Sequence, residues 1–517
     1  MIRTGFSKVV VPSSGRLFSS NATPSQIVNK HLWRTAGYIN GEFTNGSATE
    51  FFDVHNPANG SVIAKLPRMG AKDAETAAQA SYDAWQVWKN TTVKERSKVL
   101  MKMANLMTHY QEDLATIITL EAGKPLAEAR GEVMYAQSFY ELYSEEAKRI
   151  NGDVLPQSVH GRRMLAIRQP VGPAALITPW NFPSAMITRK VGPALAAGCS
   201  VAIKPAEETP MSALALCVIA EEAGLPAGIM NCLTVARSEV VDVGTAMCHS
   251  PLFRKLSFTG STPVGKWLMR ECATTVKRIS LELGGNAPFI VFDDADIETS
   301  VTALVNSKFR NAGQTCISSN RVLVQEGVYD AFAAALAARV TAMQCGDGLT
   351  EGSTCGPLIN DAAVAKVGRH VEDCVAKGAT VLAGGAAPAD LNEAGGCFFT
   401  PTVMANVTEE MLPCIEETFG PIAPLLKFKT EDEAIRIANS TRMGLASYLC
   451  TRDLARSWRV SEALEFGMVG VNEGAISADT TPFGGIKESG IGREGGPYGL
   501  EEYLEVKYIC MGGITSV

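Results

Sequence analysis

The chain has 517 residues, of which 46% are hydrophobic and 20% charged, and its formal net charge is -7 at pH 7. This length exceeds what one hydrophobic core usually supports, so we expect two or more domains in an ordinary globular protein. An acidic chain lacks the overall basic character that phosphate binding favours, which argues against nucleic acid as a main partner.

The first forty residues differ in composition from the rest of the chain. They hold basic residues and several serines, whereas the first acidic residue is Glu42. This composition is typical of a mitochondrial transit peptide, and the run Arg-Leu-Phe-Ser-Ser at 16–20 resembles a processing region. We therefore expect a transit peptide over residues 1–20 and a mature enzyme in the mitochondrial matrix; a basic tail without a targeting role is the alternative.

Short strands in a hairpin are predicted around residues 38–43, and a turn is predicted at Asn-Pro-Ala-Asn-Gly, 56–60. From residue 71 to about residue 147, apolar residues recur at helical spacing, as at Val99, Met103 and Leu106. We interpret these helices as scaffold.

From residue 171 the pattern alternates between strands and helices. Apolar strands are predicted at 174–178, 200–204 and 229–233, with a helix at about 211–222. This alternation predicts an α/β fold with a parallel sheet that is covered on both faces and binds its ligand at the carboxyl ends of the strands. Residues that fall at those ends are Trp180, Asn181, Lys204, Glu207 and Gly260.

The segment 260–267 nearly matches a P-loop, but Trp267 stands where Ser or Thr should bind magnesium. We therefore reject an NTPase function. The longest charge-free run, between Arg168 and Arg189, contains prolines throughout, so no membrane-spanning helix is expected. The segment 255–267 still predicts a strand that turns through Gly260 into a helix, whose free amides can face a pyrophosphate. A plain turn that caps a helix is the alternative.

Glu282 is a lone carboxylate in the apolar start of Leu-Glu-Leu-Gly-Gly-Asn-Ala-Pro, 281–288. Burial raises the pKa of such a carboxyl group, which suits a general base that works near neutral pH. The alternative is a glutamate paired with a structural arginine or lysine.

Cys316 is the candidate nucleophile, because the run 309–321 sets its thiol among small and polar neighbours. A free thiol has a pKa of about 8.5 and needs a nearby base or positive dipole to react at neutral pH. A small buried hydrophobe is the alternative. The thirteen cysteines include no Cys-x-x-Cys pair and the six histidines are not clustered, so neither a disulfide framework nor a metal site is expected.

Beyond the nucleophile we predict a second α/β region. An alanine-rich helix is expected at 331–342, a second helix has Val364, Val367 and Val371 on one stripe, and a final strand is expected at 503–508.

Four motifs resemble those of the aldehyde dehydrogenase superfamily. They are Trp-Asn-Phe-Pro at 180–183, Leu-Glu-Leu-Gly-Gly-Asn at 281–286, Gly-Gln-Thr-Cys at 313–316 and Glu-Glu-Thr-Phe-Gly-Pro at 416–421. The resemblance extends from about residue 35 to the C-terminus. It implies an α/β fold with a Rossmann-like NAD-binding domain at 30–152 and 168–284, an α/β catalytic domain at 285–478, and a small β oligomerisation element at 153–167 and 479–517. In the family this last element pairs across subunits, which predicts a homodimer or homotetramer.

The resemblance implies oxidation of an aldehyde to a carboxylate by hydride transfer to a nicotinamide. The Cys316 thiolate would add to the carbonyl, and the Asn181 amide with the Cys316 backbone amide would stabilise the oxyanion. After hydride transfer, Glu282 would activate the water that resolves the thioester.

The resemblance also implies a set of cofactor contacts: Trp180, the ribose-binding pair Lys204 and Glu207, the turn residues Gly260 and Ser261, and the nicotinamide-ribose contacts Glu417 and Phe419. A carboxylate at 207 repels a 2′-phosphate, so NAD is the expected cofactor, although lysine and serine neighbours leave NADP open.

Substrate choice depends on Arg189, Arg310 and Ser477, which resemble the residues that hold the distal carboxylate in succinate-semialdehyde dehydrogenases. Arginine suits this task because its planar fork pairs a carboxylate bidentately. The alternative for each arginine is a structural ion pair. Ser318 stands where many such enzymes carry a second cysteine, so the regulatory disulfide of that design is not expected.

The leading hypothesis is thus an NAD-dependent succinate-semialdehyde dehydrogenase of 4-aminobutyrate degradation. Glutarate semialdehyde or a broad range of aliphatic aldehydes are the alternative substrates. Transfer of the acyl group to coenzyme A is disfavoured by Glu282, and an inactive structural or binding protein is disfavoured by the intact set of candidate catalytic residues.

Overall fold

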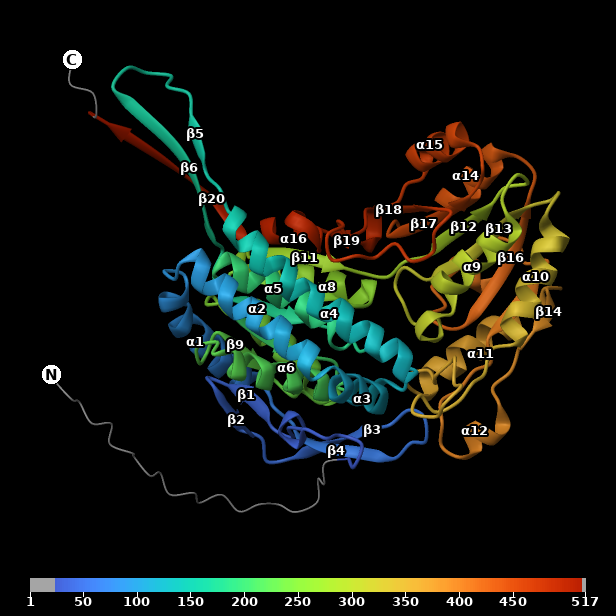
Figure 1. The fold of residues 1–517 in the computed structure, drawn as a ribbon, viewed down its shortest axis with the longest axis horizontal. Coiled ribbons are helices and arrows are strands. Elements are labelled where there is room, and N and C mark those ends of the chain that lie inside the picture. The colour runs from blue at the N-terminus through green and yellow to red at the C-terminus, as the bar shows by residue number, and fades with distance from the viewer. Residues whose placement is uncertain (1–23, 514–517) are drawn as a thin grey trace.

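The computed structural model describes residues 24–513, so the predicted transit peptide at 1–20 lies outside the described residues. Two large sheets, each with its own helices, stand side by side in Figure 1, the first on the left and the second on the right. Among the described residues, no helix combines the length and apolar character that a bilayer crossing requires.

The first large sheet has eight strands. Their order is β19 (Gly490–Ile491), β11 (Arg278–Glu282), β10 (Lys255–Thr259), β7 (Ala174–Ile177), β8 (Val201–Lys204), β9 (Met230–Cys232), β1 (Gly37–Ile39) and β2 (Glu42–Thr44). The strands from β11 to β9 are parallel, whereas β19 and β1 pair antiparallel with their neighbours. Every residue of β7, β8 and β10 is buried, as expected for a sheet covered on both faces.

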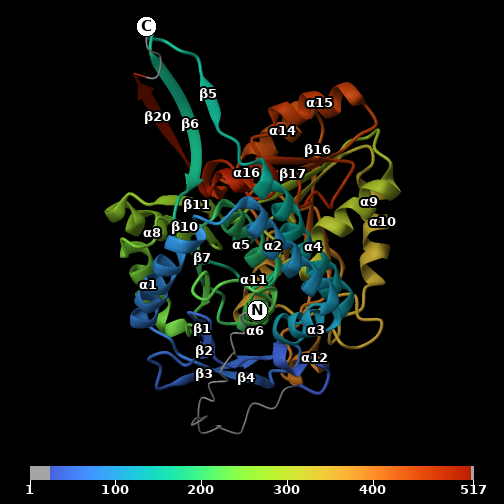
Figure 2. The same ribbon diagram turned by 60° about the vertical axis from the view of Figure 1, so that its left-hand side comes forward.

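Helices cover both faces of this sheet. One buried cluster contains side chains of α2 (Val93–His109), α3 (Gln111–Ala122), α4 (Leu126–Glu146), α5 (Ala185–Ala197) and α6 (Pro210–Ala223). Another contains side chains of α1 (Ala71–Trp88), α7 (Val240–His249) and α8 (Thr262–Cys272). In Figure 2, α1 and α8 lie on one side of β7 and β10, and α2 and α5 lie on the other.

The second large sheet has seven strands. Their order is β14 (Thr380–Ala383), β15 (Thr402–Ala405), β16 (Ile422–Phe428), β13 (Ser319–Gln325), β12 (Ala287–Val291), β17 (Ala446–Cys450) and β18 (Met468–Val471). All neighbours are parallel except β14 and β15. Buried side chains of α9 (Ile297–Lys308) and α10 (Tyr329–Thr341) form one cluster, and those of α11 (Asp361–Ala376), α13 (Leu412–Ile415), α14 (Glu431–Asn439) and α15 (Leu454–Ala463) form another.

Two small sheets complete the fold. One pairs β3 (Phe51–His55) with β4 (Val62–Pro67), and the other has the order β20 (Leu504–Gly512), β6 (Arg162–Pro170), β5 (Asp153–Leu155). The three-stranded sheet projects from the body of the protein in Figures 1 and 2. The remaining short helices are α12 (Ala389–Glu393), α16 (Gly496–Glu501), η1 (Lys30–Leu32), η2 (Ala147–Arg149), η3 (Arg237–Glu239), η4 (Ala273–Thr275), η5 (Arg310–Gly313) and η6 (Lys487–Ser489).

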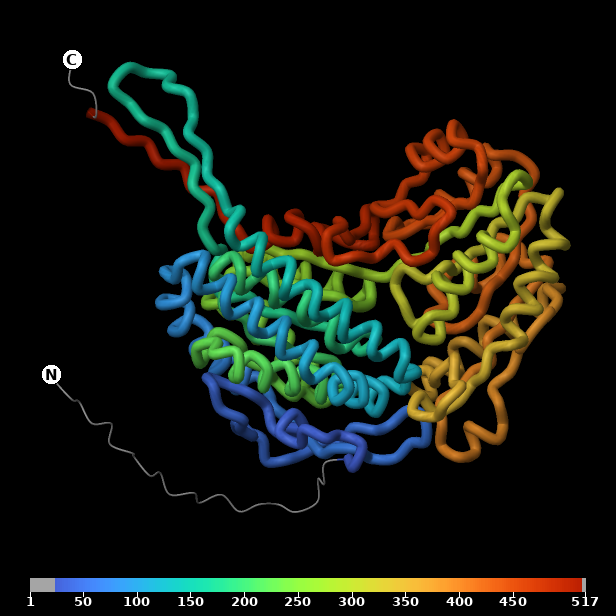
Figure 3. Tube along the Cα trace, viewed as in Figure 1, coloured from blue at the N-terminus to red at the C-terminus, as the bar shows by residue number. Residues whose placement is uncertain are grey.

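The C-terminal segment connects all of these parts. Figure 3 shows it in red as it leaves the second sheet, crosses back along the first and enters the projecting sheet. It contributes β19 to the first sheet and packs α16 against α5 before it reaches β20. The α/β fold class is thereby confirmed, with the expected strands found as β7, β8 and β10. The proposed domain boundaries remain a prediction.

Candidate active site

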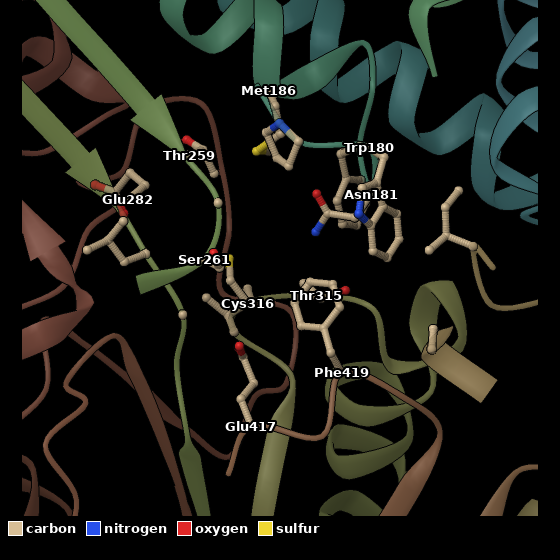
Figure 4. Close-up of a pocket in the computed structure, with 18 of the residues that line it drawn as sticks. Trp180, Asn181, Met186, Thr259, Ser261, Glu282, Thr315, Cys316, Glu417 and Phe419 are labelled. Atoms are coloured by element: carbon tan, nitrogen blue, oxygen red, sulfur yellow. The ribbon is translucent and has the colours of Figure 1, made fainter. Parts of the chain in front are cut away.

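A cavity of about 380 Å³ lies where the carboxyl ends of β7, β10 and β11 face the turn that precedes β13. Figure 4 shows side chains from both large sheets pointing into it, with Cys316 near its centre. Its lining includes Trp180, Asn181, Arg189, Gly260, Ser261, Glu282, Arg310, Cys316, Glu417, Phe419 and Ser477. These are all of the residues predicted from the sequence except Lys204 and Glu207.

Lys204 and Glu207 lie just outside this cavity. Glu207 lines an adjoining groove, which shares Glu208 and Arg237 with the cavity lining. The Lys204 ammonium lies 3.4 Å from the Glu207 carboxylate, and the Arg237 guanidinium lies 3.2 Å from it. Lys204 and Glu207 therefore form an ion pair, with a second cation beside it, and their ribose-binding role stays a prediction.

A strained turn presents Cys316 to the cavity. Asn311 and Ala312 have φ angles of 53° and 52°, a left-handed conformation that costs energy in residues with a side chain. The side chain of Gln314 holds the turn in place, because its Oε1 accepts from the Ile359 amide at 2.9 Å and its Nε2 donates to the Pro357 carbonyl at 3.3 Å. The candidate nucleophile thus lies on a turn with fixed geometry.

Burial raises the pKa of the Cys316 thiol to about 12. Arg189 opposes this shift, whereas Glu417 and Glu282 add to it. The thiol is therefore protonated at neutral pH in the free protein. Of the two activating features considered from the sequence, the neighbouring base is represented by Glu282, whose carboxyl group interacts with the thiol.

Glu282 ends strand β11 and is 3% exposed. Burial raises the pKa of its carboxyl group well above the ordinary value, Glu494 raises it further, and Arg189 and Lys190 only partly offset these effects. Its Oε2 has no hydrogen-bond partner within residues 24–513. A carboxyl group with a raised pKa and an unused oxygen is suited to take a proton from a thiol or a water.

Asn181 is tied directly to the turn that carries the nucleophile. Its Nδ2 donates to the Gln314 carbonyl oxygen at 2.9 Å, and its Oδ1 has no partner in the described part of the chain. The side chains of Asn181 and Cys316 both line the cavity, and Figure 4 labels both. Because the amide carries two hydrogens, one remains for an oxyanion on a carbon bound to Cys316.

The two candidate arginines differ. Arg189 is 1% exposed, forms an ion pair with Glu494 through Nε and lies 4.1 Å above the Phe483 ring. The structural ion pair that was the alternative for this arginine is therefore present. Arg310 forms no ion pair with any described residue; it lies 5.4 Å from the Phe182 ring, and Glu128 is a carboxylate in its neighbourhood.

Most of the residues predicted to contact a cofactor line the same cavity. Trp180 and Phe419 pack edge to face, with ring centroids 5.6 Å apart. Burial raises the pKa of Glu417 to about 7, although its Oε1 accepts from the Gly285 amide at 2.9 Å. With Gly260 and Ser261 just before α8, these residues offer a carboxylate for ribose hydroxyls and backbone amides for a pyrophosphate, so they fit a dinucleotide.

Sequence analysis missed several residues of the site. Tyr135, on a helix interpreted as scaffold, and Phe483 both line the cavity. Lys190 donates to Ser257 Oγ at 2.9 Å and to Glu494 at 2.5 Å, which forms a buried cluster beside Glu282. Phe483 and Glu494 both lie in the segment 479–517, which was predicted only as part of the oligomerisation element. Within residues 24–513 no three His, Cys, Asp or Glu side chains are grouped to bind a metal.

Comparison with known proteins gives a consistent result. A sequence model described as Aldehyde dehydrogenase family matches residues 43–509. The chain is 51% identical over its whole length to "Succinate-semialdehyde dehydrogenase, mitochondrial" of Arabidopsis thaliana, of which it covers 97%. It is 53% identical, over 94% of its own length and 99% of the relative's, to "Glutarate-semialdehyde dehydrogenase" of Pseudomonas putida.

A solved structure described as an E. coli NADP dependent enzyme superimposes with a TM-score of 0.92 at 52% identity, over 94% of this chain and 100% of that one. A betaine aldehyde dehydrogenase from Staphylococcus aureus in complex with NAD+ superimposes with a TM-score of 0.90 at 34% identity, over 94% and 96% of the two chains.

Proposed function

Because the chain belongs to the aldehyde dehydrogenase family, we propose that it oxidises succinate semialdehyde to succinate with NAD as the acceptor. The observation that carries this proposal is the position of Arg310. Its guanidinium lies at the wall of the cavity that contains Cys316, and no ion pair with another described residue neutralises it. A cation that forms no ion pair with a described residue, although the Glu128 carboxyl group lies in its neighbourhood, is suited to bind a substrate with a distal carboxylate.

The chemistry starts with the transfer of the Cys316 proton to Glu282, directly or through one water. The thiolate adds to the aldehyde carbon, and the free hydrogen of the Asn181 amide stabilises the oxygen of the resulting thiohemiacetal. Bound NAD supplies a hydride acceptor. Loss of the hydride converts the thiohemiacetal into a thioester of Cys316.

Glu282 then acts a second time. The proton taken from Cys316 first passes to solvent, which restores the Glu282 carboxylate. That carboxylate then takes a proton from a water molecule as the water attacks the thioester, and it returns this proton to the Cys316 sulfur as the acid is released. The raised pKa of Glu282 makes its carboxylate a stronger base than that of an exposed glutamate, which suits it to accept a proton and return it.

The cofactor proposal depends on Glu207. Its carboxylate is positioned by Lys204 and Arg237 and would accept two ribose hydroxyls, whereas it would repel a 2′-phosphate. We therefore propose NAD as the preferred cofactor. Arg237 is the feature that favours the alternative, NADP, because it places a positive charge beside the same site.

We further propose that the enzyme works in the mitochondrial matrix as a homo-oligomer. The Arabidopsis relative is named a mitochondrial protein, and residues 1–20 have the basic, serine-rich composition of a transit peptide. The projecting three-stranded sheet exposes apolar side chains, including Val154 and Val506, which a second subunit would cover.

The test is the ratio of kcat/KM for succinate semialdehyde to that for butanal, which has the same number of carbons and no carboxylate. One charge-assisted hydrogen-bonded pair contributes about 1.5–3 kcal/mol, so we expect a ratio of about 10 to 150 that falls toward one in Arg310→Met. Arg339→Met, which removes an exposed arginine of α10, is the matched control and should leave the ratio unchanged. A wild-type ratio near one would contradict the semialdehyde assignment.

Glutarate semialdehyde is the second candidate because relatives with that name are equally similar to this chain. It has one more methylene group than succinate semialdehyde, so its kcat/KM in the same assay tells the two substrates apart. A higher kcat/KM for the longer substrate would assign the enzyme to glutarate semialdehyde and would retain the role of Arg310.

A further inference from the structure

A buried ion pair lies directly behind Asn181, outside the cavity. The Lys124 ammonium lies 2.6 Å from the Glu132 carboxylate, and the two side chains are 1% and 0% exposed. Lys124 follows α3, where Gly123 turns the chain with a φ of 77°, and Glu132 lies on α4. Neither residue lines the cavity, so neither can touch a substrate there.

The pair holds both ends of one short turn. Lys124 Nζ donates to the carbonyl oxygen of Asn181 at 2.7 Å. Glu132 Oε1 accepts from the backbone amides of Ser184 and Ala185, at 2.9 and 3.3 Å. The turn 181–185 is thereby fixed at its first carbonyl and at its last amides by two side chains that are bonded to each other.

Two more contacts lock the same turn. The Lys124 ammonium lies 4.1 Å above the ring of Phe182, the residue after Asn181. Asn311, from the turn that carries the nucleophile, donates through Nδ2 to the same Asn181 carbonyl oxygen at 2.9 Å. The Asn181 backbone therefore receives hydrogen bonds from the scaffold and from the nucleophile turn at once.

We propose that Lys124 and Glu132 are positioning residues, which act through Asn181 by setting the direction of its side-chain amide. A buried ion pair is a weak source of stability compared with apolar residues of the same volume, so its presence calls for another reason. Apart from the bond between Lys124 and Glu132, the side-chain hydrogen bonds of these two residues go to the backbone of the turn 181–185. That turn carries the amide that is proposed to stabilise the oxyanion.

The consequence for the reaction is geometric. The Asn181 amide donates one hydrogen to the Gln314 carbonyl, and its second hydrogen must meet the oxygen on the carbon that Cys316 attacks. A donor displaced by about 1 Å from this position can cost about a hundredfold in rate. This inference depends on the proposed function for the role of Asn181, but not on the identity of the aldehyde.

The test is a double-mutant cycle on the full-length enzyme with NAD and either succinate semialdehyde or butanal. Lys124→Met keeps the length of the side chain and removes the donor. We expect it to lower kcat at least tenfold when Asn181 is present and less than twofold in an Asn181→Ala background, because the amide that it positions is then absent. A loss of equal size in both backgrounds would overturn the proposal.

A second variant addresses the case in which Lys124→Met does not fold. Lys124→Met with Glu132→Gln removes both charges, so no unpaired charge is left buried. We expect this variant to fold and to retain the low kcat. Wild-type kcat in this folded variant would overturn the proposal.

Hydrogen exchange requires no turnover, so it tests the role of the ion pair independently of the proposed function. In the Lys124 variants, backbone hydrogen exchange at 182–186 should rise, while Lys255→Met should leave it unchanged. Lys255 is the matched control because it forms another buried ion pair, 3.0 Å from Glu502, at the opposite end of β10 from the cavity. If the wild type does not prefer the semialdehyde, the proposed substrate is wrong, but kcat for butanal still tests the role of Lys124 and Glu132. Exchange at 182–186 that stays at the wild-type rate would argue that the pair does not hold the turn.

Discussion

Arg189 and Glu494 form a buried ion pair at the wall of the cavity that contains Cys316. Burial alone would raise the pKa of Glu494, but Lys190 and Arg189 together hold it below its ordinary value. The charge of Arg189 is therefore already partly compensated by the protein. Arg310 has no such partner among the described residues, so the two arginines should respond differently to substitution.

Arg189→Met should destabilise the protein far more than Arg310→Met. Removal of one partner from a buried ion pair typically costs about 3–5 kcal/mol, because the other charge is left without compensation. A half-exposed arginine without an ion pair should cost about 1 kcal/mol or less. Chemical denaturation of both variants at pH 7 measures the difference.

Arg189→Met combined with Glu494→Gln is the control for this prediction. Because Glu494 also pairs with the buried Lys190, the second substitution leaves the Lys190 ammonium without its ion pair, so the double variant should be no more stable than Arg189→Met. Equal stability of Arg189→Met and Arg310→Met would show that the ion pair with Glu494 contributes little.

The pH dependence of turnover should follow Glu282. Its carboxyl pKa is raised, first by burial and then by Glu494, so the group is protonated over a wider pH range than an exposed glutamate. A protonated carboxyl cannot accept a proton; kcat should therefore rise with pH through a pKa well above the ordinary glutamate value. Steady-state kinetics between pH 5 and pH 9 measures this rise.

Glu282→Gln is the variant that tests the assignment. It should lose the rise with pH and slow both steps that need the base, so that rapid mixing at neutral pH shows slow formation of NADH without a burst and a thioester that persists once formed. Turnover in Glu282→Gln with the wild-type pH profile would mean that another group is the base.

The features that local sequence could predict are those in which one short run carries the signal. The strand that contains Glu282, the turn at Gly260 and the run around Cys316 each show their structure in neighbouring residues, because burial, glycine and small side chains act locally. These runs then meet in one cavity, as expected for loops at the carboxyl ends of parallel strands.

Other parts of the site could not be predicted, because they depend on contacts between distant segments. Glu494 lies 304 residues beyond Lys190, and no periodicity links the two. Lys124 and Glu132 lie in a region whose helical spacing indicates scaffold. This spacing does not show which loop packs against each helix. The high pKa of the Cys316 thiol also depends on burial that the run 309–321 does not reveal.

NAD should bind more tightly as the pH rises through about 7. Burial raises the pKa of Glu417 to about 7, so most of the carboxyl groups are protonated at pH 6 and most are ionised at pH 8. Ribose hydroxyls donate to the ionised form, so we expect NAD affinity to rise by up to about tenfold over this range. Fluorescence titration with NAD at several pH values measures it.

Two variants separate Glu417 from its neighbours. Glu417→Gln should bind NAD weakly and with little dependence on pH. Burial lowers the pKa of Lys308 to about 7, and this residue interacts with Glu417, so Lys308→Met tests whether the lysine is the group that titrates. A pH dependence that survives in Glu417→Gln and disappears in Lys308→Met would assign it to the lysine.

Glu207→Ser should shift the cofactor preference toward NADP. The carboxylate that repels a 2′-phosphate is removed, while Lys204 and Arg237 lose their anionic partner and remain to bind it. One charge-assisted contact of about 1.5–3 kcal/mol corresponds to an increase of about 10- to 150-fold in the ratio of kcat/KM for NADP to that for NAD. Glu207→Ser with Arg237→Met should lose most of this gain, and an unchanged ratio in Glu207→Ser would show that another group selects the cofactor.

The projecting sheet should hold subunits together. In β20, Val506 and Tyr508 lie on the same face because successive residues of a strand alternate, and they are 67% and 57% exposed in the single chain. An interface that covers these side chains cannot accommodate an unpaired charge without a desolvation cost, so Val506→Asp should dissociate the oligomer. Light scattering after size-exclusion chromatography measures the mass. Leu454→Asp on α15 is the control, because Leu454 is 84% exposed and α15 lies far from this sheet in Figure 1. If Val506→Asp keeps the wild-type mass, the subunits associate through another surface, and β20 serves only to complete the sheet with β6.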